Sequence, residues 1–583
     1  MKKTLLLFSL VLGTLQLNAQ YFTREYGTTG NGDRLTDGGP TANGPAGHLL
    51  TGTTNIASAS DIALVRTNSA GATGGFPTFR NYYRLVNSAN ATLTATPVKV
   101  IQMPGGNIFV AGSYTGAAAT DKGVFTAVFN ASGTVQSVRG WKTISTATTT
   151  ITASSACPSN IAGDETVYVT GSVDLNPFNP TLGLGSGVFI IAVNGSTNAL
   201  VWSQTYSFSA LNGESAADII ASPYNNNAEL VVAGNYQNGT DRGSFLLRVN
   251  RNTTFPISAN TFNYTTTNES VSGICLAPHP VATSEGFALC GTTNPNSSLN
   301  RMWVFRVNAN CNTVINNAII TYSNTTSGFT GSDIITRTNS MGIVEFFASG
   351  TAVSGQLGQN DMVVEKLSST LGFVGEYTYG TAATSESNQE IAGFADGIGV
   401  YGNIRISGLA GNGDMYVTKA YYNGVTQCNS TSNTSTIATP VLTPATTPVV
   451  EIKDLFMPAL VISPLSTLSL FTYCNAVTVA GGSNLRLINQ DEEDASQSAL
   501  LVYPNPASVT DAQLTVQLTS QVAQQIEIRI TDMLGREIMN KQIFVAEGLI
   551  NTQIQLPSGL AEGVYNLQIS GEEIYQSLRF MLK

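Results

Sequence analysis

The sequence is poor in the residues on which most enzyme chemistry depends. It has two histidines among its 583 residues, and 11% of its residues are charged. His48 stands beside two leucines, His279 lies between two prolines, and no G-x-S-x-G motif is present. A Ser-His-Asp or Cys-His device needs a histidine beside a nucleophile. We therefore interpret both histidines as structural, expect no metal site built from histidines, and predict no catalytic residue.

Other classes of site and partner are disfavoured in the same way. The six cysteines include no CxxC pair, which argues against zinc-ribbon and thioredoxin-type sites. The 27 lysines and arginines are spread thinly along a chain of net charge −10, so nucleic acid is not an expected partner. Beyond the N-terminus no stretch approaches eighteen apolar residues, so no transmembrane segment is predicted. We expect a monomer without a resident cofactor, apart from the calcium considered below.

What the sequence does contain is a repeat, clearest between Gly106 and Trp141. An alternating segment ends at Gly112, a second runs from Val124 to Val128, and a third ends at Trp141, with polar turns between them. Period-two alternation bounded by Gly, Asn and Asp predicts antiparallel strands joined by hairpins. The glycine that closes the first of these strands recurs at nearly regular intervals, at Gly52, Gly112, Gly171, Gly234, Gly291, Gly350 and Gly402.

Other landmarks recur with this glycine. An apolar segment follows each copy, another precedes most copies, and an aromatic residue closes the third strand at Tyr83, Trp141, Tyr206, Tyr264, Tyr322 and Tyr379. Four strands per unit and seven units predict an all-β fold with a seven-bladed β-propeller over residues 20–427. The seventh unit lacks its aromatic, and Tyr21 to Tyr26 reads like the end of a unit. We predict that this segment completes the seventh blade, which removes an open edge.

Two pairs of segments carry a resemblance. GNIFVAG followed by VFTAVFNASG, and DMVVEKL followed by GFVGEYTYG, resemble the bacterial β-propeller repeats often called SBBP repeats. The resemblance extends over about residues 21–425. It implies architecture, because a fold does not determine a function.

Acidic residues are the group left to carry chemistry. Five of them precede the second apolar strand of their units and are interpreted as turn residues: Asp61, Asp121, Asp241, Asp361 and Asp414. Seven others follow the closing aromatics and are predicted to gather around one mouth of the propeller channel: Asp33, Glu214, Asp218, Glu269, Asp333, Glu386 and Glu390. Loop polarity alone would explain them. The functional alternatives are a site for a cation such as calcium, a glycan-binding mouth, or a carboxylate pair for glycosidic chemistry.

The N-terminus has the pattern of a signal peptide. Residues 1–19 contain two lysines and an apolar run from Leu5 to Leu12 that is too short to span a bilayer. Cleavage is predicted between Ala19 and Gln20. The mature protein is therefore expected outside the cytoplasm, where disulfides can form.

Residues 428–498 are interpreted as a linker with a strand-like segment inside it. A Ser/Thr/Pro-rich stretch comes first, and the segment from Val450 to Cys474 regains apolar character. Cys428 and Cys474 flank this region and could close it into a loop. Cys275 and Cys290 fall on neighbouring predicted strands, where they could pair or serve as small buried residues.

Residues 499–583 form a separate pattern of seven short strands, which predicts a small Ig-like β-sandwich. YPNP, ITDMLGRE, LAEGVYNLQI and a strand ending at the last residue closely resemble the type A C-terminal sorting domain of Bacteroidetes. The residues that carry the resemblance are Tyr503, Pro504, Asn505, Pro506, Asp532, Leu534, Gly535, Arg536, Gly563, Tyr565 and Lys583. It implies passage through the periplasm and outer membrane by type IX secretion, removal of the domain by a sortase, and release or attachment to lipopolysaccharide. The alternative is an Ig-like adhesive module.

Together these features predict a secreted or cell-surface propeller that binds a glycan or another surface ligand without catalysis. The alternative is a polysaccharide-active hydrolase or lyase that uses the acidic mouth. A retaining glycosidase needs carboxylates about 5 Å apart and an inverting one about 6.5–9.5 Å.

Overall fold

The computed structural model describes residues 22–474 and 501–583 with gaps, most of which lie between strands. Outside the description are residues 1–21, 28–31, 42–46, 55–59, 70, 73–77, 88–90, 118–121, 144–149, 175–185, 209–211, 239–240, 264–267, 279–284, 295–298, 322–327, 340, 354–358, 381–383, 407–412, 424–429, 434–435, 439–442, 447–448, 453–454, 457–459, 466–468, 475–500, 504–506, 508–512, 521–523, 533–535, 546–547, 558–559 and 571–574. The predicted signal peptide and its cleavage site at Ala19 and Gln20 are among them.

The fold is all-β. The chain divides into two compact units, residues 1–481 and 482–583. A single 3-10 turn, η1 (Asn225–Asn227), is the helical element of the described residues, and none of their helices is long and apolar enough to cross a membrane.

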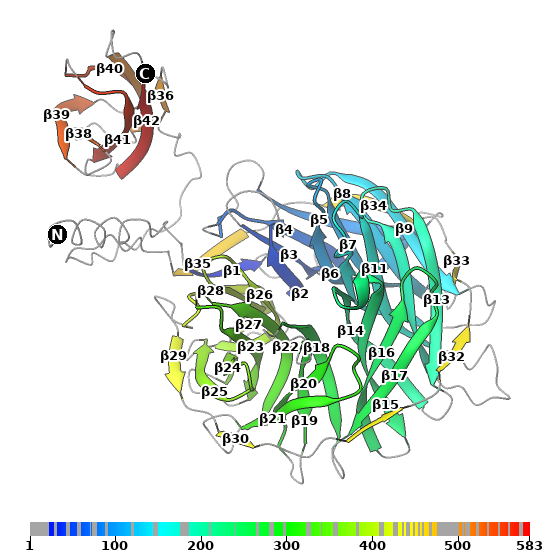
Figure 1. The fold of residues 1–583 in the computed structure, drawn as a ribbon. Coiled ribbons are helices and arrows are strands. Elements are labelled where there is room, and N and C mark those ends of the chain that lie inside the picture. The colour runs from blue at the N-terminus through cyan, green and yellow to red at the C-terminus, as the bar shows by residue number, and fades with distance from the viewer. Residues whose placement is uncertain are drawn as a thin grey trace. The chain divides into compact units, whose positions relative to one another are not determined.

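The first unit contains seven antiparallel sheets of four strands, numbered here in chain order (Figure 1). The first sheet is β2 (Asp33–Pro40), β3 (His48–Thr54), β4 (Asp61–Arg66) and β5 (Phe79–Asn87), and the second is β6 (Thr92–Gln102), β7 (Ile108–Thr115), β8 (Lys122–Phe129) and β9 (Val135–Thr143). The third is β10 (Ile151–Pro158), β11 (Thr166–Asp174), β12 (Ser186–Asn194) and β13 (Leu200–Phe208), and the fourth is β14 (Asn212–Ser222), β15 (Glu229–Asn238), β16 (Asp241–Asn250) and β17 (Pro256–Asn263). A short β5–β6 pairing joins the first two sheets.

The remaining sheets continue the series. The fifth is β18 (Glu269–Ala277), β19 (Gly286–Thr293), β20 (Arg301–Asn308) and β21 (Val314–Thr321), and the sixth is β22 (Phe329–Thr338), β23 (Val344–Val353), β24 (Asn360–Ser368) and β25 (Phe373–Tyr379). The seventh is β26 (Thr384–Gly393), β27 (Ile398–Ile406), β28 (Gly413–Ala420) and β1 (Phe22–Gly27). The first strand of each sheet packs on the preceding sheet, and β2 packs on the seventh, so the sheets close a cycle. In Figure 1 the first strands lie toward the middle of this ring.

The N-terminal strand completes the seventh sheet, as the sequence predicts. β1 pairs antiparallel with β28, with Tyr26 opposite Met415. Tyr83 and Trp141 occupy the same place in their sheets, opposite Ile62 and Val124. The Tyr26 hydroxyl donates to the Gly71 carbonyl of the first sheet at 2.6 Å. This buried bond crosses the closure of the ring.

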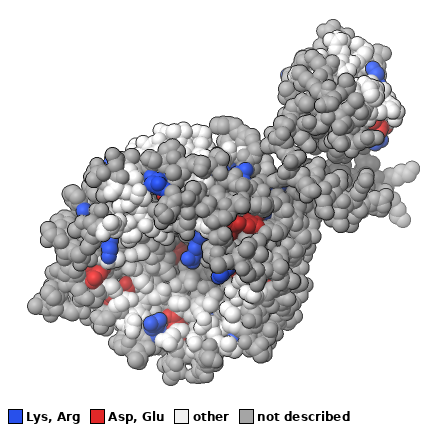
Figure 2. Space-filling view, turned by 180° about the vertical axis from the view of Figure 1, so that it is seen from behind, with Lys and Arg blue, Asp and Glu red and all other residues white. Residues whose placement is uncertain are grey.

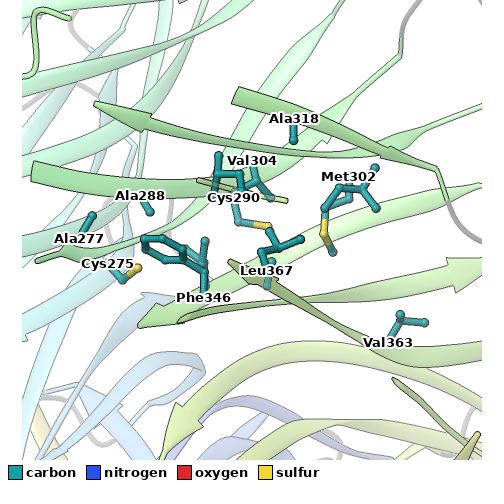
Figure 3. Close-up of a cluster of buried hydrophobic side chains, with 14 of the residues drawn as sticks. Cys275, Ala277, Ala288, Cys290, Met302, Val304, Ala318, Phe346, Val363 and Leu367 are labelled. Carbon is teal, nitrogen blue, oxygen red and sulfur yellow. The ribbon is translucent and has the colours of Figure 1, made fainter. Parts of the chain in front are cut away.

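Burial explains which strands the sequence reveals. The third strands are almost wholly buried on both faces, as in β4 and β12, because they are covered by the sheets on either side. Such strands read as continuous apolar runs. The first strands alternate between buried and partly exposed residues, as in β22. The described residues of the ring form seven apolar clusters, most of them built from two adjacent sheets. Figure 3 shows the cluster between the fifth and sixth sheets.

The landmark glycines have a common structural cause. Each first strand has a β-bulge directly after the residue that faces the glycine, as at Leu35 opposite Gly52 and Val271 opposite Gly291. A Cβ on any of the seven glycines would lie 1.8–2.4 Å from a carbonyl oxygen of the bulged strand. That distance is impossible, so only glycine allows the two backbones to approach this closely.

A strap follows the ring and runs around its outside. It comprises β29 (Ser430–Asn433), β30 (Thr436–Ala438), β31 (Thr443–Thr446), β32 (Val449–Ile452), β33 (Leu455–Phe456), β34 (Leu460–Leu465) and β35 (Ser469–Cys474). These strands pair with the outer strands of the sixth, fifth, fourth, third, second, first and seventh sheets in that order. The predicted linker is therefore a series of edge strands in this region. It covers one open edge on every sheet.

The second unit consists of two sheets around one apolar core. The three-stranded sheet is β36 (Leu501–Tyr503), β37 (Gln513–Ser520) and β40 (Gly548–Gln555). The four-stranded sheet is β39 (Glu537–Val545), β38 (Gln524–Asp532), β41 (Gly563–Ser570) and β42 (Tyr575–Leu582). Both sheets contribute alternating side chains to the core, among them Leu514, Ile528 and Leu567. The unit thus has a core of its own.

Candidate functional site

The bulges of the first strands place one residue from each sheet at an equivalent position. We call the first residues paired after the seven bulges the bulge ring: Asp37, Lys99, Ser155, Asp218, Gly273, Asp333 and Glu390. Three of them belong to the predicted acidic mouth. The other four were not singled out from the sequence, because hairpins of unequal length separate this position from the landmark glycine.

Carboxylates of the bulge ring connect neighbouring sheets. Asp37 accepts the backbone N–H of Val100 at 2.7 Å, Asp218 accepts that of Ile274 at 3.0 Å, and Asp333 accepts that of Ile391 at 3.2 Å. Each bond runs from one sheet to the next. The Ser155 hydroxyl also donates to Asp218 at 2.6 Å. These acids therefore have a structural use, because they satisfy donors on the adjacent sheet.

Lys99 supplies a cation to this group. Its Nζ lies 2.9 Å from Oδ1 of Asp37 and 2.6 Å from Oε1 of Glu390. Burial lowers the pKa of Lys99, but the surrounding carboxylates outweigh burial and hold that pKa well above its ordinary value. Burial raises the pKa of Asp333 to about 7, and that of Glu390 also stands well above its usual range. One ammonium cannot neutralise all of the carboxylates around it, so Asp333, whose pKa is about 7, is partly protonated near neutral pH.

The other four acids of the predicted mouth occupy a different position. Each lies two residues before the residue of its strand that faces the landmark glycine. Asp33, Glu214, Glu269 and Glu386 are at most 2% exposed. The equivalent residues of the other three sheets are apolar and buried: Ala95, Ile151 and Phe329. The Thr384 hydroxyl donates to Glu386, and that of Thr293 donates to Glu269 at 3.4 Å. The seven predicted acids thus divide into four that lie between sheets and three in the bulge ring.

Asp33 lies beside two further carboxyl groups where the ring closes. Burial, a hydrogen bond with Glu25 and the charges of Glu25 and Asp33 raise the pKa of Asp414 to about 9. Asp414 is therefore protonated at neutral pH. Among the described residues no group of three or more His, Cys, Asp or Glu is arranged to hold a metal ion. The suggested calcium site has no support in this part of the chain.

A polar pocket of about 800 Å³ opens beside the same closure. Its described lining comes from the first, second, sixth and seventh sheets and is Gly32, Asp33, Arg34, Thr36, Thr53, Ser60, Thr96, Asn360, Ser385, Ser387, Asn403, Ile404, Arg405 and Gly413. Hydroxyl, amide and guanidinium groups dominate this lining. Its one acid, Asp33, has no exposed surface, whereas Arg34 and Arg405 are exposed. The volume lies within the range of ordinary ligand pockets.

On the face drawn in Figure 2, the charged side chains of the described residues do not gather into one large patch of a single sign. There the charged side chains form small separate groups among white and grey residues.

His48 is a buried neutral residue at the closure of the ring. Its Nδ1 lies 3.0 Å from the Tyr401 hydroxyl, and its ring centroid is 4.7 Å from that of Phe394. Burial, with a further contribution from the charges of Lys419 and Arg24, lowers the pKa of His48 to about 3. This agrees with a structural histidine. His279 lies outside the described residues.

The cysteine predictions have different outcomes. Cys275 faces Ala288 and Cys290 faces Gly273 in the register of β18 and β19, and both thiols are free. The suggested pair is thus not formed. Both residues are buried in the apolar cluster of Figure 3, which fits their other interpretation as small core residues. Cys428 lies outside the described residues, and only the backbone of Cys474 is described, in β35.

The second unit contains the predicted sorting motifs. Asp532 and Arg536 form an ion pair at 3.0 Å, and the Tyr565 hydroxyl donates to the Ala561 carbonyl at 2.7 Å. The Lys583 N–H donates to Ala507 at 2.9 Å, which ties the last residue to the start of the unit. Tyr503 ends β36 and Gly563 begins β41. Pro504, Asn505, Pro506, Leu534 and Gly535 lie outside the described residues.

Comparison with known proteins identifies the C-terminal region. Residues 501–583 match the family model of the secretion system C-terminal sorting domain. No curated protein matches the chain. The protein is therefore exported through type IX secretion to the cell surface or the medium, as the sequence motifs imply.

Two of the solved structures that match the chain resemble it only weakly. One is PorZ of Porphyromonas gingivalis, described as an essential bacterial surface component of the type-IX secretion system. It is 9% identical over 97% of this chain and 99% of that chain, with a TM-score of 0.14. Another is the E. coli alpha-2-macroglobulin, 7% identical over 96% of this chain and 44% of that chain, with a TM-score of 0.12.

Proposed function

We propose that this protein is a surface-delivered binding module. Its ring is a seven-bladed β-propeller, and its C-terminal unit is an Ig-like sandwich that a sortase removes after export, with release or attachment to lipopolysaccharide. The cyclic order of seven four-stranded sheets, closed by β1 on β28, supports the propeller. The two-sheet core of residues 482–583 supports the sandwich. The export route supports a ligand outside the cell.

The polar pocket is the observation that carries the binding function. It is the right size for a few sugar residues, and its hydroxyl and amide groups match the hydrogen-bonding surface of a carbohydrate. The second and seventh sheets contribute residues that are distant in sequence, Thr96 and Asn403 among them. Such a site forms only when the ring closes.

The hydrolase alternative has less support. A glycosidase needs two carboxyl groups in contact with the same glycosidic bond. The described pocket lining holds one acid, Asp33, and that residue is fully buried. The bulge-ring acids accept backbone N–H groups and hold Lys99. These acids act as structural groups in the described part of the chain.

A glycan-array screen of the full-length protein, with a hydrolysis assay on every hit, tests this function. Thr96 and Thr94 are both exposed on β6, but only Thr96 lines the pocket. We expect Thr96→Trp to abolish binding by filling the pocket and Thr94→Trp to leave it unchanged. Hydrolysis of a bound glycan would favour the enzyme. Equal binding by both variants would remove the pocket as the site.

A further inference from the structure

We propose that the pocket at the ring closure recognises an oxyanion carried on a polar scaffold, a carboxylated or sulfated saccharide, through Arg34 and Arg405. This inference rests on the proposed binding function and names its ligand class. The sequence suggested an acidic mouth that would attract cations. The exposed charges of the described pocket lining have the opposite sign.

The two arginines stand on contacting strands of the first and seventh sheets, which come from opposite ends of the ring sequence. Arg34 lies on β2 and Arg405 on β27. Asn403 joins these strands because its amide oxygen accepts the Leu35 N–H at 2.6 Å and its amide nitrogen donates to the Leu35 carbonyl at 3.1 Å. Each arginine is within two residues of this pair of hydrogen bonds. The strands that carry the guanidinium groups are therefore held in a fixed relation before a ligand arrives.

Cross-strand neighbours complete a donor-rich surface. Thr53 faces Arg34, and Ser385 faces Arg405, in the registers of their sheets. On its other side Arg405 faces Gly413, which has no side chain and so leaves room above the strand. Guanidinium groups bind carboxylate and sulfate oxygens through paired N–H donors, and hydroxyl groups can bind either the anion or a sugar hydroxyl.

The residues that line the pocket favour binding of a charged group over stacking on the apolar face of a sugar ring. No aromatic residue is among the described lining residues, so stacking on a sugar ring is not provided by this part of the pocket. Asp33 is fully buried, and the adjacent Asp414 retains its proton. An incoming anion therefore meets two exposed guanidinium groups with little opposing charge at the surface.

Binding of defined oligosaccharides to the full-length protein tests the inference by calorimetry. The probes are an oligogalacturonate, which carries only carboxylates, a κ-carrageenan oligosaccharide, which carries only sulfates, and a neutral cello-oligosaccharide of similar length. We expect at least one acidic probe to bind more than tenfold tighter than the neutral one, because each charge-assisted hydrogen bond contributes about 1.5–3 kcal/mol, or roughly tenfold or more. The acidic probe that binds better identifies the anion as carboxylate or sulfate.

Glutamine variants locate the site. Arg34→Gln and Arg405→Gln should each weaken the acidic probe about tenfold, and the double variant should reduce it to the affinity of the neutral probe. Arg242→Gln is the matched control. Arg242 is exposed, is not among the described lining residues of the pocket, and lies at the β15–β16 hairpin of the fourth sheet, which corresponds to the β27–β28 hairpin beside Arg405. It should change the affinity less than twofold. Unaltered tryptophan fluorescence and melting show that the variants remain folded.

Two results overturn the inference and are distinguishable from each other. Tighter binding of the neutral probe, unaffected by the arginine variants, would refute anion recognition while the binding function stands. Loss of affinity in Arg242→Gln equal to that in Arg405→Gln would show diffuse charge attraction instead of a site. Absence of binding to any glycan of the array would reject the proposed function itself.

Discussion

Replacing His48 should remove a defined part of the pH dependence of the stability of the ring. The His48 pKa is about 3 in the folded protein and 6.5 in its ordinary state. Between these two pH values the His48 imidazole is protonated in the unfolded chain but neutral in the folded protein. The folded state is therefore destabilised as the pH falls below 6.5, and stability rises with pH through this window.

The size of the effect follows from the pKa difference. At pH 4.5 the unfolded imidazole is two pH units below its pKa, which corresponds to about 2.7 kcal/mol at about 1.4 kcal/mol per unit. At pH 7.5 the contribution is close to zero. Because pH 4.5 lies well above the folded pKa of about 3, a change of one unit in that value would hardly alter the result.

Urea unfolding of the wild-type protein and of His48→Gln at both pH values measures this contribution. The three tryptophans, Trp141, Trp202 and Trp303, all lie in the ring unit, so their fluorescence reports its unfolding alone. Between pH 7.5 and 4.5 the wild-type protein should lose about 2.7 kcal/mol more than His48→Gln. The subtraction cancels the groups that both proteins share.

A second variant separates burial from the hydroxyl contact. Tyr401→Phe removes the hydroxyl group 3.0 Å from Nδ1 but keeps the imidazole covered. Since burial is the main cause of the low pKa, this variant should keep most of the pH dependence. A difference below about 1 kcal/mol between wild type and His48→Gln would refute the reasoning, because it would mean that the folded protein accommodates the imidazolium.

Three further predictions concern the bulge ring, the closure and the export unit. Lys99→Met should destabilise the ring by about 3 kcal/mol in urea unfolding, because it leaves buried carboxylates without their cation. Lys122→Met, outside that cluster, should cost about 0.5 kcal/mol or less. Equal effects of the two variants would contradict the role of Lys99. Deleting Tyr21 to Tyr26 should cause aggregation or a large loss in melting temperature, because β1 pairs on both sides with β28 and β35. Tyr26→Phe should cost only about 1 kcal/mol, for the lost hydrogen bond to Gly71. A monomeric deletion variant with an unchanged melting temperature would contradict the closure. Deleting Leu500 to Lys583 should leave the tryptophan unfolding curve unchanged and trap the protein in the periplasm, as fractionation would show; normal secretion of the full-length protein from a host without the type IX translocon would refute the export role.

The features that the sequence predicted are those in which side-chain chemistry determines the structure. Third strands such as β12 are buried on both faces and therefore read as apolar runs. The glycines are required at each bulge, and the aromatic residues reach into the next sheet, as when the Tyr206 hydroxyl donates to the Thr254 carbonyl. The sorting unit was predictable because its motifs are local.

The strap was not predictable because its pairing uses backbone groups. An edge strand needs no alternation of apolar residues, and β31 and β34 each contain a proline, which an edge tolerates. The Ser/Thr/Pro-rich composition of this region therefore resembles a linker. The burial of four acids of the predicted mouth was likewise not predictable from the sequence. Glu214 and Glu269 have the polarity of loop residues, but they occupy positions that are apolar in other sheets, where Ile151 and Phe329 lie.

The position of β1 makes the ring depend on both ends of its sequence. β1 lies between β28 and β35 in the seventh sheet, so the sheet is complete only when the residues near 22, 415 and 470 come together. The strap pairs with the other six sheets before it reaches this one. A chain that ends before the strap would leave seven outer edges open, and open edges favour aggregation. Because the sorting unit follows the strap in sequence, the export signal is synthesised only after every strand of the ring. The order of the chain thus ensures that any molecule addressed for export already contains all the strands needed to close its ring.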